Sequence, residues 1–387
     1  MNPAKANPGE ALEAASELYA RRVERAREEA AAGRTVVGFV GADVPRELIV
    51  AAGAIPLRLH SRPGFASGDA KDLLGEAIDP VAHSILGQIL AGELDFLAGI
   101  AFSRDSSASL QQFYVARQLA SRRPSLPPVH LVDLLHLRRE SSLEYDRREV
   151  HRFAKTLSNW TGREVSAETL REAMRGCSEL RERLGKAQKL RREGRLTGSQ
   201  SLHLFAAAES LHPRDALKLV NRALLEQADT AEIDGLRVFF SGSGQDTDTI
   251  YACLEALGAH IVGEDHDWGQ LRLTVSCDPS ASDHVEGLLD ELARAYHRSG
   301  PAAATSAMAE RARWTVDQAR FAGVGMVLCF TRAFDDAPAW DYPPQRELLA
   351  EADIPSVLLS RQPADGSPQQ LERALAPFLE RTTAGQL

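Results

Sequence analysis

Short apolar runs alternate with stretches of helical spacing along most of the chain. In the N-terminal part the apolar runs are residues 36–40, 55–59, 96–102 and 128–133, with helical stretches between them, among them 80–92 and 108–122. After Gly235 the predicted strands are 237–242, 260–265, 325–330 and 355–360, and the predicted helices are 247–257, 283–297, 306–321, 343–352 and a C-terminal helix. Strands that alternate with helices in this way predict parallel sheets with helices on both faces.

The same pattern divides the chain into four segments. Residues 1–33 carry an N-terminal helix that ends at Gly33, and residues 142–233 contain charged helical stretches without a convincing strand. The strand and helix alternation occupies 34–141 and 234–387. The sequence therefore predicts an α/β fold with two doubly wound parallel-sheet domains, flavodoxin-like or Rossmann-like, joined by a helical segment.

Composition and charge narrow the classes of function. The net charge is -9 and the pI is near 5.7, which argues against a protein that binds nucleic acid by neutralising phosphates. No apolar run approaches the roughly 18 residues of a membrane helix, and the N-terminus is polar, so we expect a cytoplasmic protein without membrane contact. The four cysteines are widely spaced, and buried free thiols are the simplest interpretation: Cys177, Cys253, Cys277 and Cys329.

Two glycine-rich or acidic loops follow predicted strands. The loop that begins Ser241-Gly242-Ser243-Gly244 precedes a helix, so its amides and hydroxyls are a candidate anion site, although a plain turn is the favoured interpretation. The stretch EDHDWGQ, 264–270, contains candidate metal ligands. Because they are consecutive, they point to different sides, and a polar loop is the favoured interpretation.

Histidines and a basic run are further candidates. We interpret His60, His83 and His130 as structural histidines, since none has a partner at helical spacing. The basic run 181–195 is a candidate for binding an acidic partner or the phosphates of a ligand. A solvated helix face is the favoured interpretation of that run.

Four stretches, in this order, resemble the 2-hydroxyacyl-CoA dehydratase family, which includes the subunits of ATP-dependent benzoyl-CoA reductase. They are Val37 to Leu59 (VGFVGADVPRELIVAAGAIPLRL), Ala77 to Phe113, Arg237 to Gly269 and Ala333 to Leu359 (AFDDAPAWDYPPQRELLAEADIPSVLL). Together they span nearly the whole chain. One such stretch alone would be weak evidence for the family, whereas four in the same order and spacing are specific evidence.

The resemblance implies a [4Fe-4S] cluster bound by three cysteines on loops at strand ends, yet this chain lacks all three. The positions of those ligands fall on Asp79, Arg104 and Asp335, while Asp105 and Asp336 match neighbouring family residues and are candidates for the cleft. Clusters of this kind need thiolates, so we expect this chain to bind neither cluster nor metal. The favoured hypothesis is a bridge from Asp79 and Asp335 to Arg104; a new acid–base or anion site is the alternative.

The function expected from the resemblance is that of a cluster-free subunit in a dehydratase or reductase complex. Its partners would be a homologous subunit that carries the [4Fe-4S] cluster, an acyl-CoA thioester and an ATP-dependent electron activator, and the chain would not be catalytic alone. One alternative is a free-standing protein that binds a CoA thioester or another anionic small molecule in the cleft and does non-redox chemistry. Another is a scaffold or regulatory protein without a ligand.

Overall fold

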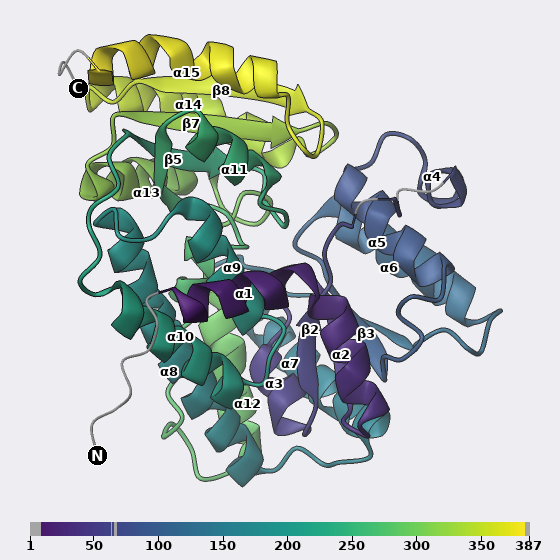
Figure 1. Cartoon of the computed structure of the whole chain (residues 1–387). Coiled ribbons are helices and arrows are strands. Elements are labelled where there is room, and N and C mark those ends of the chain that lie inside the picture. Colours follow the sequence, from purple (N-terminus) through teal and green to yellow (C-terminus); the bar gives the residue numbers. More distant parts are fainter. Residues whose placement is uncertain (1–8, 63, 66–67, 384–387) are drawn as a thin grey trace.

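The eight strands of the described residues form two separate parallel sheets (Figure 1). The computed structural model describes residues 9–62, 64–65 and 68–383. The first sheet has the order β2-β1-β3-β4 and consists of β1 (Val36–Val40), β2 (Ile55–Arg58), β3 (Gly99–Ser103) and β4 (Val129–Val132). The second has the order β6-β5-β7-β8 and consists of β5 (Leu236–Gly242), β6 (Ala259–Glu264), β7 (Met326–Arg332) and β8 (Ser356–Gln362). The predicted fold class, with two doubly wound domains, is confirmed.

The predicted N-terminal helix is in fact two helices, α1 (Glu10–Ala20) and α2 (Arg22–Ala31). Arg21, between them, leaves helical geometry at φ -114° and ψ 20°. Helix α1 packs on α9 and α10 (bounds below), whereas α2 packs on the first sheet, so the chain must turn between two buried faces. Residues 1–8 of the predicted N-terminal segment and 384–387 of the predicted second domain lie outside the described residues.

Helices cover both faces of each sheet. Those that follow or flank the first sheet are α3 (Arg46–Ala51), α4 (Gly68–Leu74), α5 (Pro80–Leu90) and α6 (Ser107–Ala120). The segment after β4 forms α7 (Glu140–Thr161), α8 (Ala167–Arg192), α9 (Gly198–Ala208) and α10 (Pro213–Gln227). The remaining helices are α11 (Thr249–Ala256), the 3-10 helix η1 (Gln270–Thr274), α12 (Val285–His297), α13 (Met308–Ala322), α14 (Ala337–Glu351) and α15 (Pro368–Thr383).

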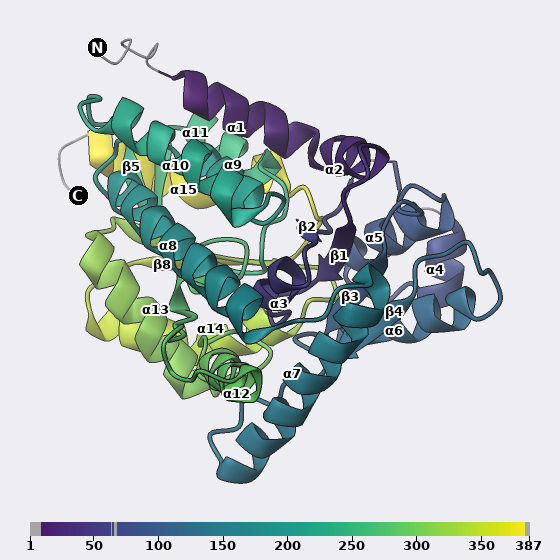
Figure 2. The ribbon, with the colours of Figure 1, turned by 90° about the horizontal axis from the view of Figure 1, so that it is seen from below.

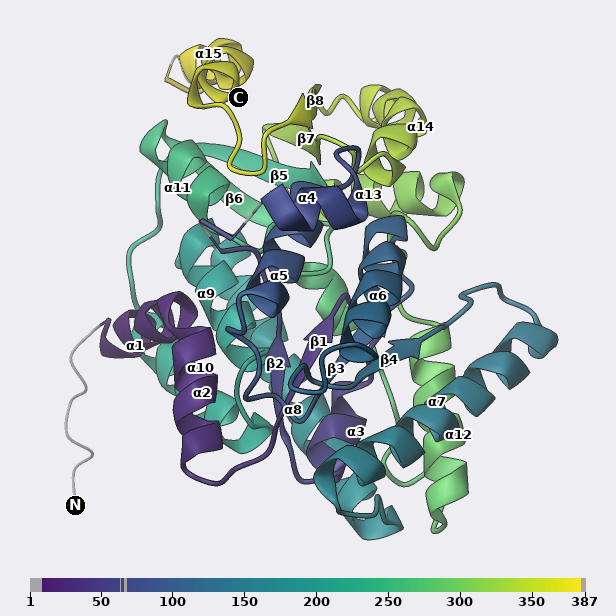
Figure 3. The same cartoon turned by 90° about the vertical axis from the view of Figure 1, so that its right-hand side faces the viewer.

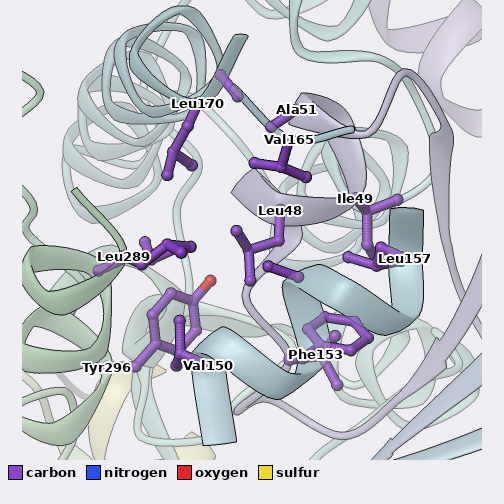
Figure 4. Packing of buried hydrophobic residues seen from close by; sticks show 14 of the residues in the cluster. Leu48, Ile49, Ala51, Val150, Phe153, Leu157, Val165, Leu170, Leu289 and Tyr296 are labelled. Carbon is purple, nitrogen blue, oxygen red and sulfur yellow. The ribbon is translucent and has the colours of Figure 1, made fainter. Parts of the chain in front are cut away.

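The helical segment and α12 build the largest core cluster on one face of the first sheet. Side chains from α3, α7, α8 and α12 meet there (Figure 4), among them Leu48, Phe153, Leu170, Leu289 and Tyr296. Figure 2 shows α12 beside α7, although the two helices are far apart in sequence. Burying each large apolar side chain stabilises the fold by roughly 1.5–3 kcal/mol, so segment 142–233 is part of this core as well as a connection. The domain boundaries themselves stay a prediction.

Two elements of the second half differ from the prediction at their ends, and both differences matter for the site. Strand β7 continues past Phe330 to Arg332. Helix α14 begins at Ala337, six residues before the predicted start, with Pro338 in its first turn, where proline's missing N–H costs nothing. The loop between β7 and α14 is therefore only residues 333–336.

Among the described residues, no helix combines the length and the apolar character needed to cross a membrane.

Candidate functional site

A cavity of about 180 Å³ lies where the carboxyl ends of strands from both sheets meet. Its walls include Gly41 after β1, Arg58 at the end of β2, Asp105 after β3, Gly242 at the end of β5 and Arg332 at the end of β7. In Figure 3 the second sheet lies above the first, with α5 and α6 beside the gap; both helices contribute residues to the cavity wall. Parallel sheets place ligand sites at this edge, as the sequence predicted.

Arg332 joins two of the three predicted ligand positions. Its Nε donates to Oδ1 of Asp79 at 3.0 Å and its Nη2 to Oδ2 at 2.7 Å, and Oδ2 of Asp335 lies 3.7 Å from the same Nη2. Asp79 is also the N-cap of α5, accepting from the amide of Val81 at 3.1 Å. A bidentate, charge-assisted pair of this kind is the strong form of an ion pair.

The loop that carries Asp335 is shaped to reach this arginine. Phe334 adopts the left-handed region at φ 66°, and the amide of Asp335 donates to the carbonyl of Arg332 at 3.2 Å. Burial raises the pKa of the Asp335 carboxyl, and the neighbouring Arg332 opposes that rise. The main-chain amide of Arg332 donates to Oγ of Ser243 at 3.0 Å. The side-chain Nη1 of Arg332 donates to the carbonyl of Gly244. All parts of Arg332 are therefore held in place.

The predicted bridge through Arg104 is wrong. Arg104 does not line the cavity; its side chain is 47% exposed and pairs with Asp133 at 3.1 Å. Both residues lie in the bend after β3, where the side chain of Asp105 joins the cavity wall and that of Arg104 points outward to Asp133. Asp336 is also misplaced by the prediction, because it is exposed at the N-cap position of α14 and is not part of the cavity wall.

Asp105 lies in a second acidic group at the cavity. Its Oδ2 accepts the amide of Ala42 at 2.5 Å. Gly41 is required here, because φ is +87° and a Cβ would lie 1.9 Å from Oγ of Ser103. Burial, and then the nearby Asp43 and Asp267, raise the pKa of Asp105 to about 6.

His136 neutralises Asp43 in this group. Its Nε2 lies 2.6 Å from Oδ2 of Asp43. Burial alone would lower the pKa of His136, but the Asp43 carboxylate outweighs it and raises the pKa to about 9. His136 is therefore an imidazolium at neutral pH.

Three donors of the candidate anion loop are occupied by the protein. The hydroxyl of Ser241 donates to Asp265 at 2.6 Å, and the amide of Gly242 donates to the same carboxylate at 3.0 Å. The amide of Ser243 donates to the carbonyl of Phe330 at 2.8 Å. Gly242 and Gly244 do line the cavity. The amides of Gly242 and Ser243, however, have no free hydrogen to offer an anion.

The stretch 264–270 is a buried network rather than the expected polar loop. Glu264 pairs with Arg191 at 2.8 Å, and Tyr251 Oη lies 2.8 Å from Nε2 of His266. Burial would raise the pKa of Glu264, but Arg191 lowers it well below its usual range. Asp265 faces the other way, accepting from Thr315 at 2.7 Å. The predicted divergence holds only for Asp265, because Glu264 and His266 point to the same side, with Nε2 of His266 3.3 Å from Oε2 of Glu264.

Part of the predicted solvated basic face is buried as well. Arg191 is fully buried, and Arg181 pairs with the buried Glu47. Lys186 and Lys189 on the same helix are exposed, as expected. The three structural histidines are each hydrogen-bonded in the protein: His60 to Arg22, His83 to the carbonyl of Gly75 and His130 to Thr156.

Behind the cavity, Glu209 joins the two halves of the chain. Its carboxylate accepts from Arg46 at 2.9 Å and from Arg272 at 3.2 Å, and Arg272 also donates to the carbonyl of Ala42 at 2.6 Å. Burial would raise the pKa of Glu209, but Arg272 and Arg46 lower it to about 2. All three side chains are buried.

Several residues of the site were missed by sequence reasoning. Arg332 lies two residues after an apolar run, and Arg58 ends a buried strand. Arg58 lies 4.0 Å from the ring of Trp268 and donates to the carbonyl of Asp267 at 2.8 Å. A charged residue at the carboxyl end of a parallel strand was the available signal in both cases.

The cavity wall contains more acidic than basic side chains. Seven aspartates and three arginines line it. The aspartates are Asp43, Asp79, Asp105, Asp246, Asp265, Asp267 and Asp335, and the arginines are Arg58, Arg311 and Arg332.

The residues at the three matched positions do not fit a [4Fe-4S] cluster. Asp79 and Asp335 are hard oxygen donors already engaged by Arg332, and Arg104 faces away from the cavity. Iron–sulfur clusters of this type need soft thiolates. None of the four cysteines lines the cavity, and Cys329, the nearest in sequence, is a buried core residue of β7, as predicted.

Comparison with known proteins agrees with the resemblance seen in the motifs. Residues 42–381 match the family model described as 2-hydroxyglutaryl-CoA dehydratase, D-component. A relative, the (R)-phenyllactyl-CoA dehydratase beta subunit of Clostridium sporogenes, is 23% identical over 357 residues, which cover 90% of this chain and 92% of that protein. Because the family model covers nearly all of the chain, the protein belongs to the 2-hydroxyglutaryl-CoA dehydratase D-component family.

Proposed function

We propose that this chain is a cluster-free subunit of a 2-hydroxyacyl-CoA dehydratase-like complex, in which a homologous subunit carries the [4Fe-4S] cluster. One observation carries the proposal: Arg332 holds Asp79 and Asp335, the residues at two of the matched ligand positions, in a closed ion pair. A fold keeps its shape when its chemistry is lost, and the relative named above is itself a subunit.

The role of this subunit would be to close the substrate pocket and to exclude water beside the partner's cluster. Electrons from an ATP-dependent activator would reach the partner, and the acyl-CoA thioester would react there. The dehydratase form of this proposal is preferred to the benzoyl-CoA reductase form because both the family model and the relative are named as dehydratases.

The charge of the cavity disfavours the alternative of a free-standing protein that holds an anion there. An excess of carboxylates over arginines raises the free energy of any phosphate or carboxylate placed in the cavity. The candidate amides for an anion are also taken by Asp265 and Phe330. A CoA thioester that contacted this cavity would do so with its uncharged acyl part.

Co-expression with a cysteine-bearing homologue tests the proposal. We expect a heteromeric complex on size-exclusion chromatography with light scattering, with an interface of about 2,000 Å² or more, as in permanent complexes. Iron and sulfide analysis after anaerobic reconstitution should find the cluster only when the homologue is present. A monomer or homodimer that ignores the homologue, or a stoichiometric cluster on this chain alone, would contradict the proposal.

A further inference from the structure

A groove lies at the opposite edge of the first sheet, where β1 and β2 begin. Two adjoining cavities of about 510 and 460 Å³ share Gly53, Arg163, His212 and Arg214 and so form one continuous groove. It is bounded by α3, α8 and α10; α8 packs on both of the others, in the lower part of Figure 1. Each volume falls within the range of small-molecule sites.

The groove combines an apolar floor with charged walls, in which cations outnumber carboxylates by five to four. Apolar atoms come from Val50, Ala51, Ala173, Pro213 and Leu217. The cations are Arg34, Arg163, Arg175, Arg214 and Lys218, and the carboxylates are Glu164, Glu172, Glu179 and Asp215. In the 460 Å³ part, four of these cations face a single carboxylate, Asp215, although the chain as a whole carries a net charge of -9.

Arg163 is the central cation, and within the described part of the chain its guanidinium makes no ion pair. Gly53 leaves the space for it: a Cβ there would lie 2.6 Å from Nη1 of Arg163, and φ at Gly53 is +75°. Arg214 contacts Glu172 only at 3.8 Å, between side chains that are 71% and 77% exposed. Such a surface contact is weak and easily exchanged for a ligand.

The local field and the adjacent helix both favour negative charge. Helix α10 begins at Pro213, so its positive dipole end faces the groove. Burial and the neighbouring Arg214 lower the pKa of His212, whose ring accepts the amide of Arg214 at 3.3 Å. His212 therefore caps the helix as a neutral imidazole. Lys218 pairs with Asp215 and Arg34 with Glu29, which leaves Arg163 and the weakly held Arg214 for a ligand.

We propose that this groove binds an organic phosphate of nucleotide size, with the phosphates on Arg163 and Arg214 and the ring against the apolar floor. Planar, forked guanidinium groups suit phosphate oxygens, and the floor accommodates a flat apolar group. This site is separate from the cavity at the other sheet edge and does not depend on the subunit function proposed above. A free nucleotide and the nucleotide end of CoA share this chemistry.

Calorimetric titration of the full chain with ADP tests the site at low ionic strength. We expect ADP to bind, and adenosine to bind at least about tenfold more weakly. Arg163→Glu should lower the affinity for ADP by about tenfold or more, because a charge-assisted pair is lost. The matched control is Arg346→Glu, an exposed arginine of α14 without an ion pair in the described structure, which changes the net charge equally and should leave the affinity within about twofold.

Titration with CoA and with pyrophosphate completes the design. If Arg163→Glu weakens the binding of CoA and of ADP to the same degree, the nucleotide end of CoA is identified as a source of the ligand. If ADP binds and CoA does not, a free nucleotide is favoured. Pyrophosphate that binds as tightly as ADP would overturn the role of the apolar floor. No heat from ADP at millimolar concentration, or equal weakening by Arg163→Glu and Arg346→Glu, would overturn the site itself.

Discussion

The cavity between the sheets and the groove at the opposite edge use charge in opposite ways. In the cavity, several charged side chains are held in pairs within the protein, among them Arg332 with Asp79 and His136 with Asp43. In the groove, the cations are exposed and the central one, Arg163, has no carboxylate partner among the described residues. Charges that the protein neutralises internally hold its parts together, whereas charges left open are available to a ligand. Stability should therefore depend on the first set and binding on the second.

The largest expected effect is at Glu209, behind the cavity. Glu209→Gln keeps the shape but leaves Arg46 and Arg272 buried without a counter-charge, so the free energy of unfolding should fall by about 3–5 kcal/mol. Urea unfolding at pH 7 measures it. The matched control is Glu172→Gln in the groove, whose exposed contact with Arg214 should be worth less than about 0.5 kcal/mol. Equal losses in the two variants would remove the distinction between the regions.

Arg332→Met should produce the next largest loss, about 2–4 kcal/mol, because two carboxylates lose their shared cation. The loss is smaller than at Glu209 since Asp335 is 22% exposed and can be rehydrated. Arg104→Met is the control, and its exposed pair with Asp133 should cost about 0.5 kcal/mol or less. Chemical denaturation measures the free energy of unfolding of both variants. A larger loss for Arg104→Met than for Arg332→Met would support the bridge predicted from the sequence.

The pH dependence of stability should reveal the buried Asp105. Its pKa is about 6 in the folded protein against 3.8 as the ordinary value, so the folded state holds a proton that the unfolded state releases. The contribution of this group to stability is present below about pH 4 and is lost as pH rises through 6. The free energy of unfolding of Asp105→Asn, taken relative to that of the native chain, should therefore be about 2 kcal/mol higher at pH 7.5 than at pH 4.

Urea unfolding at the two pH values, with Asp336→Asn as an exposed control, measures the effect of Asp105. A difference between Asp105→Asn and the native chain that does not change with pH would show that Asp105 is ionised in the folded state.

The fold was predictable because the relevant signals are local. Strand β1 was predicted with its observed bounds, 36–40, since an apolar run between a helix end and a turn has few alternatives. The split between α1 and α2 was not predictable, because no glycine or proline marks it. It follows from tertiary packing, because α1 packs on α9 and α10 whereas α2 packs on the first sheet.

The site was predictable only in part, for the same reason. Asp79 and Asp335 were placed at strand and helix ends by motif, and the structure brings them together. Their cation was misassigned because Arg104 lies in the bend after β3, where no strand alternation fixes its direction, whereas Arg332 is the last residue of β7. Arg332 lies two residues beyond the predicted end of its strand, within the usual error of a strand boundary.

The smallest expected effect on stability is at Arg163, the residue on which the groove depends for binding. Arg163→Glu removes no ion pair known in the described structure, and its side chain lies in an open groove over Gly53. The melting temperature should change by about 2 °C or less, and the free energy of unfolding by less than about 0.5 kcal/mol. Thermal and urea unfolding without ligand measure both. A loss above about 1 kcal/mol would mean that this guanidinium supports the fold, and the groove would then resemble the cavity rather than contrast with it.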